Sequence, residues 1–80
     1  MYKKDDKIRF KKKVEVYEDD KLVVWANKGD IGVVEEDERT YEGMRMVPVR
    51  SVLHDSVMVL MNYNDIINID DTIELISSES

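Results

Sequence analysis

Asn27-Lys28-Gly29-Asp30-Ile31-Gly32-Val33-Val34 connects one run of strand-forming residues to the next and holds two of the three glycines. Glycine adopts positive φ without a Cβ clash, so Gly29 suits a tight turn. Gly32, one residue into the next apolar run, suits a bulge or the close approach of another backbone segment. The stretch therefore predicts a corner at which one strand ends and another begins.

Runs of alternating or β-branched residues on both sides of this corner predict an all-β protein. Lys7–Tyr17 alternates apolar and charged residues and is interrupted at Lys12, and Leu22–Ala26 is the second run. The polar residues between them favour a hairpin. Further strands are predicted at 31–36, 44–50, 57–61 and 72–76. Pro48 places its strand at an edge or a bulge, whereas the apolar 57–61 strand is expected at the centre.

The chain of 80 residues is predicted to form one domain, 1–80, with a flexible basic arm at 1–6 and a tail at 77–80. No segment repeats apolar residues at helical spacing, so no long helix is expected. A short 3₁₀ turn is predicted near residues 62–66. Five to six short antiparallel strands fit a small barrel, because closure removes exposed sheet edges.

Two segments resemble parts of small SH3-like barrels. Lys28–Val34 resembles the Gly-Asp-x-Gly-x-Val turn and strand of such domains, including KOW-type and photosystem accessory-type barrels. Asn62–Ile66 resembles the 3₁₀ segment before their last strand. The chain has Trp25 alone, so it departs from proline-peptide-binding SH3 domains, which carry paired tryptophans. The resemblance implies a fold and does not specify an activity.

The composition excludes several classes of function. The chain has no cysteine, so disulfides and Cys-based zinc or iron–sulfur sites are excluded. Its longest apolar run, Val57–Met61, is far shorter than the ~20 residues that a membrane-spanning helix needs. No apolar signal region follows the first residues. We therefore expect a cytoplasmic protein that has no membrane contact and no cofactor.

Catalytic and metal-binding motifs are weak. His54-Asp55-Ser56 has the residue types of a hydrolase triad, but neighbours on one loop cannot converge from separate elements as that relay requires. The acidic run Glu35–Glu38 offers oxygen ligands for a hard cation. It lacks the alternation and central glycine of a calcium-binding loop. We predict no enzymatic activity and no metal site.

Charge is unevenly distributed along the chain. Residues 1–13 carry seven Lys or Arg and two Asp, a net charge of +5, while the rest carry −11 and the whole chain −6. An acidic body repels the phosphates of nucleic acids, whereas a basic segment attracts them or another acidic surface. The two charge classes therefore lead to different functional hypotheses.

The first hypothesis is a non-catalytic protein-binding module that uses an acidic surface, because such charge speeds and orients association and Tyr is common at binding hot spots. The predicted contact residues are Lys28, Asp30, Glu35, Glu36, Asp37, Glu38, Tyr41 and Glu42. Small acidic chains also occur among phage and mobile-element products. One version is therefore an inhibitor whose carboxylates occupy a basic groove of a host protein.

The alternative hypothesis is nucleic-acid binding by the outward side chains near the N-terminus, Lys7, Arg9, Lys11 and Lys13. These side chains equally suit a solvated strand that resists edge-to-edge pairing. The basic face could also pair with the acidic segment of a second copy and form a homodimer. Trp25 suits either a buried position or a recognition surface.

Overall fold

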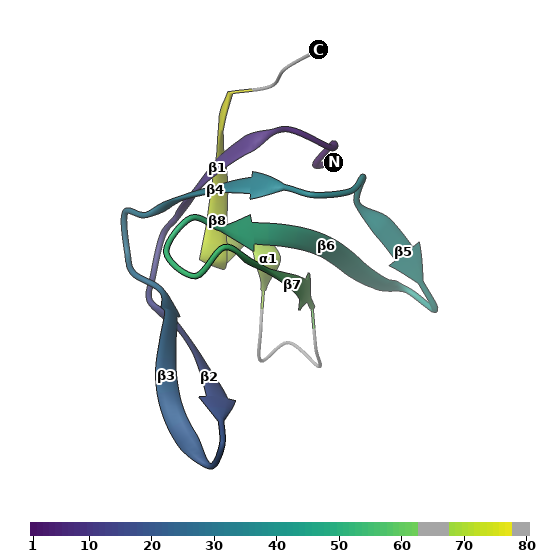
Figure 1. Ribbon diagram of the computed structural model, residues 1–80. Coiled ribbons are helices and arrows are strands. Elements are labelled where there is room, and N and C mark those ends of the chain that lie inside the picture. The colour runs from purple at the N-terminus through teal and green to yellow at the C-terminus, as the bar shows by residue number, and fades with distance from the viewer. Residues whose placement is uncertain (63–67, 78–80) are drawn as a thin grey trace.

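The computed structural model describes residues 1–62 and 68–77, and these residues form an all-β protein with one short helix (Figure 1). The described strands are β1 (Lys7–Phe10), β2 (Val14–Glu18), β3 (Lys21–Ala26), β4 (Ile31–Val34), β5 (Arg39–Tyr41), β6 (Met44–Ser51), β7 (Ser56–Met61) and β8 (Ile73–Ser77). Helix α1 (Ile69–Thr72) precedes β8. The all-β prediction is confirmed, with more strands than predicted. Residues 63–66 of the 3₁₀ turn predicted near 62–66 lie outside the described residues, and so do 78–80 of the predicted tail.

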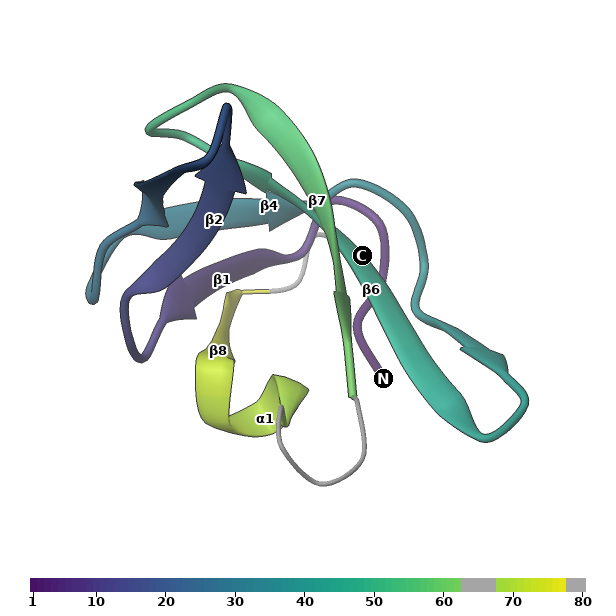
Figure 2. The ribbon, with the colours of Figure 1, turned by 90° about the horizontal axis from the view of Figure 1, so that it is seen from below.

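The strands form two antiparallel sheets. The larger follows the order β5-β6-β4-β1-β8, and β7 pairs with the other edge of β6. The smaller is the β2–β3 hairpin. The larger sheet curls into a half-barrel (Figure 2), which is compatible with a small SH3-like barrel. Within the described residues no strand pairing joins β7 to β8 or to β2, so one edge of β7 is left without a partner.

The glycine-bearing corner matches the sequence prediction. Gly29 has a φ of +92°, and the carboxylate of Asp30 accepts a hydrogen bond from Asn27 N at 2.9 Å, which closes the turn. A Cβ on Gly32 would lie 3.0 Å from the carbonyl oxygen of Arg50 and 3.1 Å from the ring of Phe10. Gly32 therefore lets β4 fit tightly between β1 and β6.

The predicted strand at 7–17 is two strands in two different sheets. β1 pairs with β4 and β8, whereas β2 pairs with β3. The chain bends at Lys11–Lys13, which keeps the Lys12 ammonium out of the core. The predicted hairpin is confirmed: Asp19 and Asp20 have φ values of 51° and 63°, the pattern of a type I′ turn.

The predicted positions of β6 and β7 are wrong. Among the described residues, β6 has partners on both edges and β7 lies at an edge. β6 tolerates Pro48 because β4 pairs with residues 49–51 and β5 with residues 44–46, so that no strand pairs with Pro48 between them. The carbonyl of Pro48 still accepts a hydrogen bond from Glu35 N at 2.9 Å. The missing N–H of Pro48 therefore removes no bond from a ladder.

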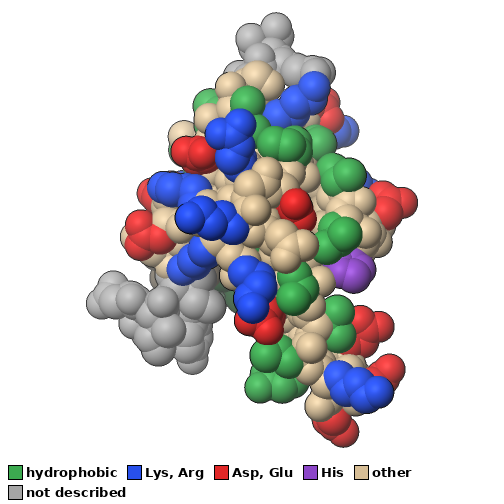
Figure 3. Space-filling view, turned by 90° about the vertical axis from the view of Figure 1, so that its left-hand side faces the viewer, with side chains coloured by type: hydrophobic (Ala, Val, Ile, Leu, Met, Phe, Trp, Pro, Cys, Tyr) green, Lys and Arg blue, Asp and Glu red, His purple; other side chains and the backbone are tan. Residues whose placement is uncertain are grey.

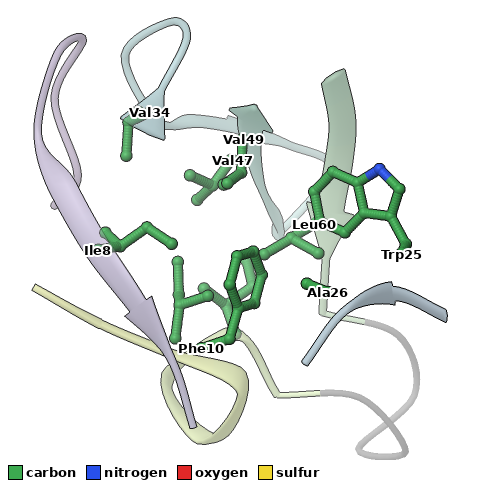
Figure 4. Packing of buried hydrophobic residues seen from close by; sticks show 10 residues of the cluster. Ile8, Phe10, Trp25, Ala26, Val34, Val47, Val49 and Leu60 are labelled. Atoms are coloured by element: carbon green, nitrogen blue, oxygen red, sulfur yellow. The ribbon is translucent and has the colours of Figure 1, made fainter. Parts of the chain in front are cut away.

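A single apolar core fills the inside of the curl (Figure 4). Phe10 and Trp25 meet edge to face, with ring centroids 5.6 Å apart and an interplanar angle of 89°. The buried cluster consists of Ile8, Phe10, Trp25, Ala26, Val34, Val47, Val49, Leu60, Ile69 and Ile73. It links the hairpin and α1 to the larger sheet.

Residues 1–6, for which a flexible arm is predicted, make backbone hydrogen bonds to the end of β4 and to Glu38. Asp5 N donates to Val34 O at 2.8 Å, and Val34 N donates to Asp6 O at 2.9 Å. Glu38 N donates to Tyr2 O at 2.9 Å. The polar composition of residues 1–6 does not predict this pairing, because its hydrogen bonds come from the backbone.

Candidate functional site

The predicted acidic surface is divided by internal contacts. Glu38 is 6% exposed, and its carboxylate accepts hydrogen bonds from Arg45 at 2.8 Å. Glu35 accepts two hydrogen bonds from Arg50 at 3.1 Å. Asp37 accepts a hydrogen bond from Lys4 N at 2.8 Å. These carboxylates therefore hold the fold together, and only part of the run is free to meet a partner.

The two arginines act as bridges. Arg45 also contacts Asp70 at 2.9 Å, and Arg50 also contacts Asp55 at 3.0 Å. The hydrogen bonds from Arg45 hold the pKa of Glu38 below its ordinary value, and those from Arg50 do the same for the pKa of Glu35. Neither arginine was predicted as a partner of these carboxylates, although Arg45 and Arg50 lie on either side of Pro48 in the strand that follows the acidic run.

The remaining residues of the predicted surface do not form one patch. Lys28 and Asp30 lie in the turn before β4, whereas Glu36 follows β4, and Tyr41 and Glu42 lie at the β5–β6 turn (Figure 1). The two groups are therefore at opposite ends of β4. The Tyr41 side chain is 63% exposed.

The predicted nucleic-acid-binding residues are exposed, and three of them have partners. Arg9 lies 3.5 Å from Glu74, and Lys13 lies 3.3 Å from Glu15. Lys11 Nζ donates to the Asp70 carbonyl at 2.7 Å. Lys7 is also exposed, on β1. Lys and Arg side chains gather on one part of the face in Figure 3, so a basic area exists on this acidic protein.

The side chains of His54 and Ser56 are held by β3. His54 Nε2 lies 2.6 Å from Val24 O, and Trp25 Nε1 donates to Ser56 Oγ at 2.9 Å. Trp25 is 5% exposed, so of its two interpretations the buried one is confirmed. These contacts attach the β2–β3 hairpin to the turn between β6 and β7.

β7, which was predicted to lie at the centre of the fold, carries a candidate surface. Val57, Val59 and Met61 of β7 are 44%, 47% and 40% exposed, while Met58 and Leu60 point inward. On the outer face of the sheet Val59 lies opposite Pro48, and Met61 lies opposite Met46 of β6. This group of residues, Met46, Pro48, Val57, Val59 and Met61, is called the outer apolar stripe below.

The backbone of β7 is also available for pairing. Pro48 points its carbonyl toward Glu35 N and away from β7, so Pro48 and Val59 form a non-hydrogen-bonded pair. The N–H and C=O groups of Val59 therefore face the unpaired edge, as do those of Val57 and Met61 by the same alternation. Among the described residues no other segment bonds to these groups.

A groove of about 400 Å³ runs along this edge. One wall is residues 58–61 of β7, and the opposite wall is residues 12–15 at the start of the hairpin. Ile69 and Thr72 of α1 also line it. The lining is mainly apolar, with Lys12, Lys13 and Glu15 as its charged members, so the groove combines an apolar wall with a basic one.

Comparison with known proteins finds no family profile, no curated protein and no solved structure that matches the chain. In residues 1–62 and 68–77, no three His, Asp or Glu side chains are grouped to hold a metal ion. No helix in that part of the chain is long and apolar enough to cross a membrane.

Proposed function

We propose that this protein is a non-catalytic protein-binding module that contacts its partner through β7. One observation carries the proposal: among the described residues β7 is an edge strand with unpaired backbone groups, and its outward side chains are all apolar. Strand edges and apolar side chains are the two features by which sheet proteins most readily associate. Here both lie on the six residues Ser56–Met61.

The sequence of β7 supports this interpretation. Edge strands of monomeric proteins are commonly protected by lysine, proline or a bulge. Residues 56–61 contain no charged residue and no proline, and their pairing with β6 is regular over all six positions. An unprotected apolar edge of this length is a liability unless a partner covers it.

The acidic version of the hypothesis has weaker support. An inhibitor that imitates phosphates needs carboxylates that are exposed and aligned, whereas Glu35 and Glu38 are bound to arginines of β6. Glu36 and Glu42 are exposed, but each lies apart from the turn at Lys28. The proposed contact surface is therefore β7 and not the acidic run.

The test compares two equivalent changes. Val59→Lys places a charge on the outer apolar stripe, and Leu22→Lys places the same charge on a similarly exposed residue of β3. Tagged protein of each kind is used to recover partners from a lysate of the native host, and thermal unfolding shows that both are folded. We expect Val59→Lys alone to lose the recovered protein. Equal recovery by both variants would overturn the proposal.

Nucleic-acid binding remains a second candidate because Lys11, Lys12 and Lys13 are consecutive and exposed at the bend between β1 and β2. Its test is a titration with single- and double-stranded DNA and RNA at low salt. Binding that falls steeply with salt, and that is weakened by replacing the three lysines with alanine, would favour this candidate. No binding at low salt would exclude it.

A further inference from the structure

We infer that the groove between β7 and residues 12–15 takes one extended, mainly apolar segment of a partner protein, which carries acidic residues where it passes Lys12 and Lys13. The segment adds a strand to the free edge of β7. This inference rests on the proposed function and specifies the partner's chemistry. It draws on three observations: the two walls of the groove, the direction of the β7 backbone groups, and the charge of the opposite wall.

The two walls favour a single chain over a second sheet. β7 forms one side, and Lys12–Glu15 with the start of β2 forms the other. A second copy of the protein could approach with its own β7, but the β6 strand of that copy would then occupy the space where residues 12–15 lie. A single extended segment occupies only the width of one strand. A groove closed on both sides therefore suits a peptide strand better than a symmetric dimer.

The backbone of β7 sets the register of the added strand. The N–H and C=O groups of Val57, Val59 and Met61 face the groove side, two residues apart, as one antiparallel or parallel ladder requires. An added strand turns alternate side chains toward the groove lining, where Val14, Met58 and Leu60 are apolar. The partner's inward residues are therefore apolar.

The opposite wall determines the charge of the partner. Lys12 and Lys13 line the groove, and the one carboxylate on this wall, that of Glu15, lies 3.3 Å from the Lys13 ammonium. The wall thus carries a net positive charge on a chain whose total is −6. The protein as a whole carries a net negative charge, whereas this wall attracts acidic segments. The complementary partner carries Asp or Glu where it passes residues 12 and 13.

The experiment begins with a selection. Random peptides of about eight residues, within the usual range of strand lengths, are displayed and selected against the full chain. We expect the recovered peptides to be mainly apolar and to carry at least one Asp or Glu. Recovery of peptides rich in Lys or Arg, or of peptides without Asp or Glu, would overturn the inference.

Two variants then locate the bound peptide. Lys12→Glu with Lys13→Glu should weaken binding about tenfold, while Lys21→Glu with Lys28→Glu, which changes the total charge equally, should have little effect. Val59→Pro removes an N–H that faces the free edge and breaks no bond to β6, so it should keep the fold and weaken peptide binding at least about tenfold.

The other occupants give different results. Dimerisation of the peptide-free protein in sedimentation, abolished by Val59→Pro, would assign the edge to a second copy and overturn the inference. Displacement of the peptide by single-stranded DNA that itself binds at Lys12 and Lys13 would assign the wall to nucleic acid, with the same consequence. A third outcome separates this inference from the proposed function. If Val59→Lys abolishes partner recovery, while neither Val59→Pro nor Lys12→Glu with Lys13→Glu weakens it, the protein binds a partner through β7 but the partner does not add a strand.

Discussion

Arg45 Nε lies 2.8 Å from Oε2 of Glu38, and this pair joins the acidic segment to the central strand β6. Glu38 is buried, and the same carboxylate accepts a hydrogen bond from Tyr2 N at 3.3 Å. Glu38→Gln should lower the free energy of unfolding by about 2 kcal/mol, because it leaves Arg45 without its nearest counter-charge. Urea unfolding measures the change.

The matched control for this change is Glu36→Gln. Glu36 is exposed two residues away, so its substitution should alter stability by less than about 0.5 kcal/mol. Equal effects of the two substitutions would show that the pair of Glu38 and Arg45 does not stabilise the fold.

The same pair predicts how stability depends on pH. The folded-state pKa of Glu38 is lowered from 4.5 by the hydrogen bonds of Arg45. The ionised carboxylate therefore makes its full contribution to the free energy of unfolding above pH 4.5. This contribution is lost as the pH falls through the lowered pKa, and Glu35 acts in the same direction through Arg50. Urea unfolding over a pH series should show stability falling below pH 4.5, with a shallower fall in Glu38→Gln. Identical slopes would contradict the assignment.

The tight approach at Gly32 predicts a local cost for any side chain. Gly32→Ala places a Cβ 3.0 Å from a backbone carbonyl of β6, which cannot rotate away as a flexible side chain could. We expect a loss of about 1–3 kcal/mol in the free energy of unfolding. Unchanged stability would show that β4 does not fit closely between β1 and β6.

Trp25 provides an intrinsic signal, because the chain contains one tryptophan. Its ring is buried and its N–H donates to Ser56, so native fluorescence should be blue-shifted and should move to the red on unfolding. Ser56→Ala leaves that N–H without its partner and should cost about 1 kcal/mol. Native emission at the longer wavelength of a solvent-exposed tryptophan would contradict the burial of Trp25.

The fold class followed from local patterns that the sequence displays directly. The glycines of the corner, the Asp19–Asp20 turn and the period-two alternation are properties of neighbouring residues. The positions of β6 and β7 in the sheet depend on pairing between distant segments. Pro48 suggested an edge, but its backbone faces the gap between two strands that share one side of β6. A proline can therefore occupy a central strand.

The candidate surface was missed for a related reason. A continuous apolar run such as Val57–Met61 is typical of a strand buried on both faces, and a single sequence does not reveal that one face lacks a cover. The acidic run was assigned to the surface by its charge, although Glu38 is buried against Arg45. The sequence contains the arginines that pair with this run, but it does not reveal which residues of the run lie opposite them.

Amide hydrogen exchange along β7, measured by NMR in the free protein and with a selected peptide, tests the central claim most directly. In the free protein we predict fast exchange at Val57, Val59 and Met61 and slow exchange at Met58 and Leu60, which bond to β6. The peptide should slow the first three. Slow exchange at these three positions in the free protein, or no change when the peptide binds, would contradict an open edge that accepts a partner strand.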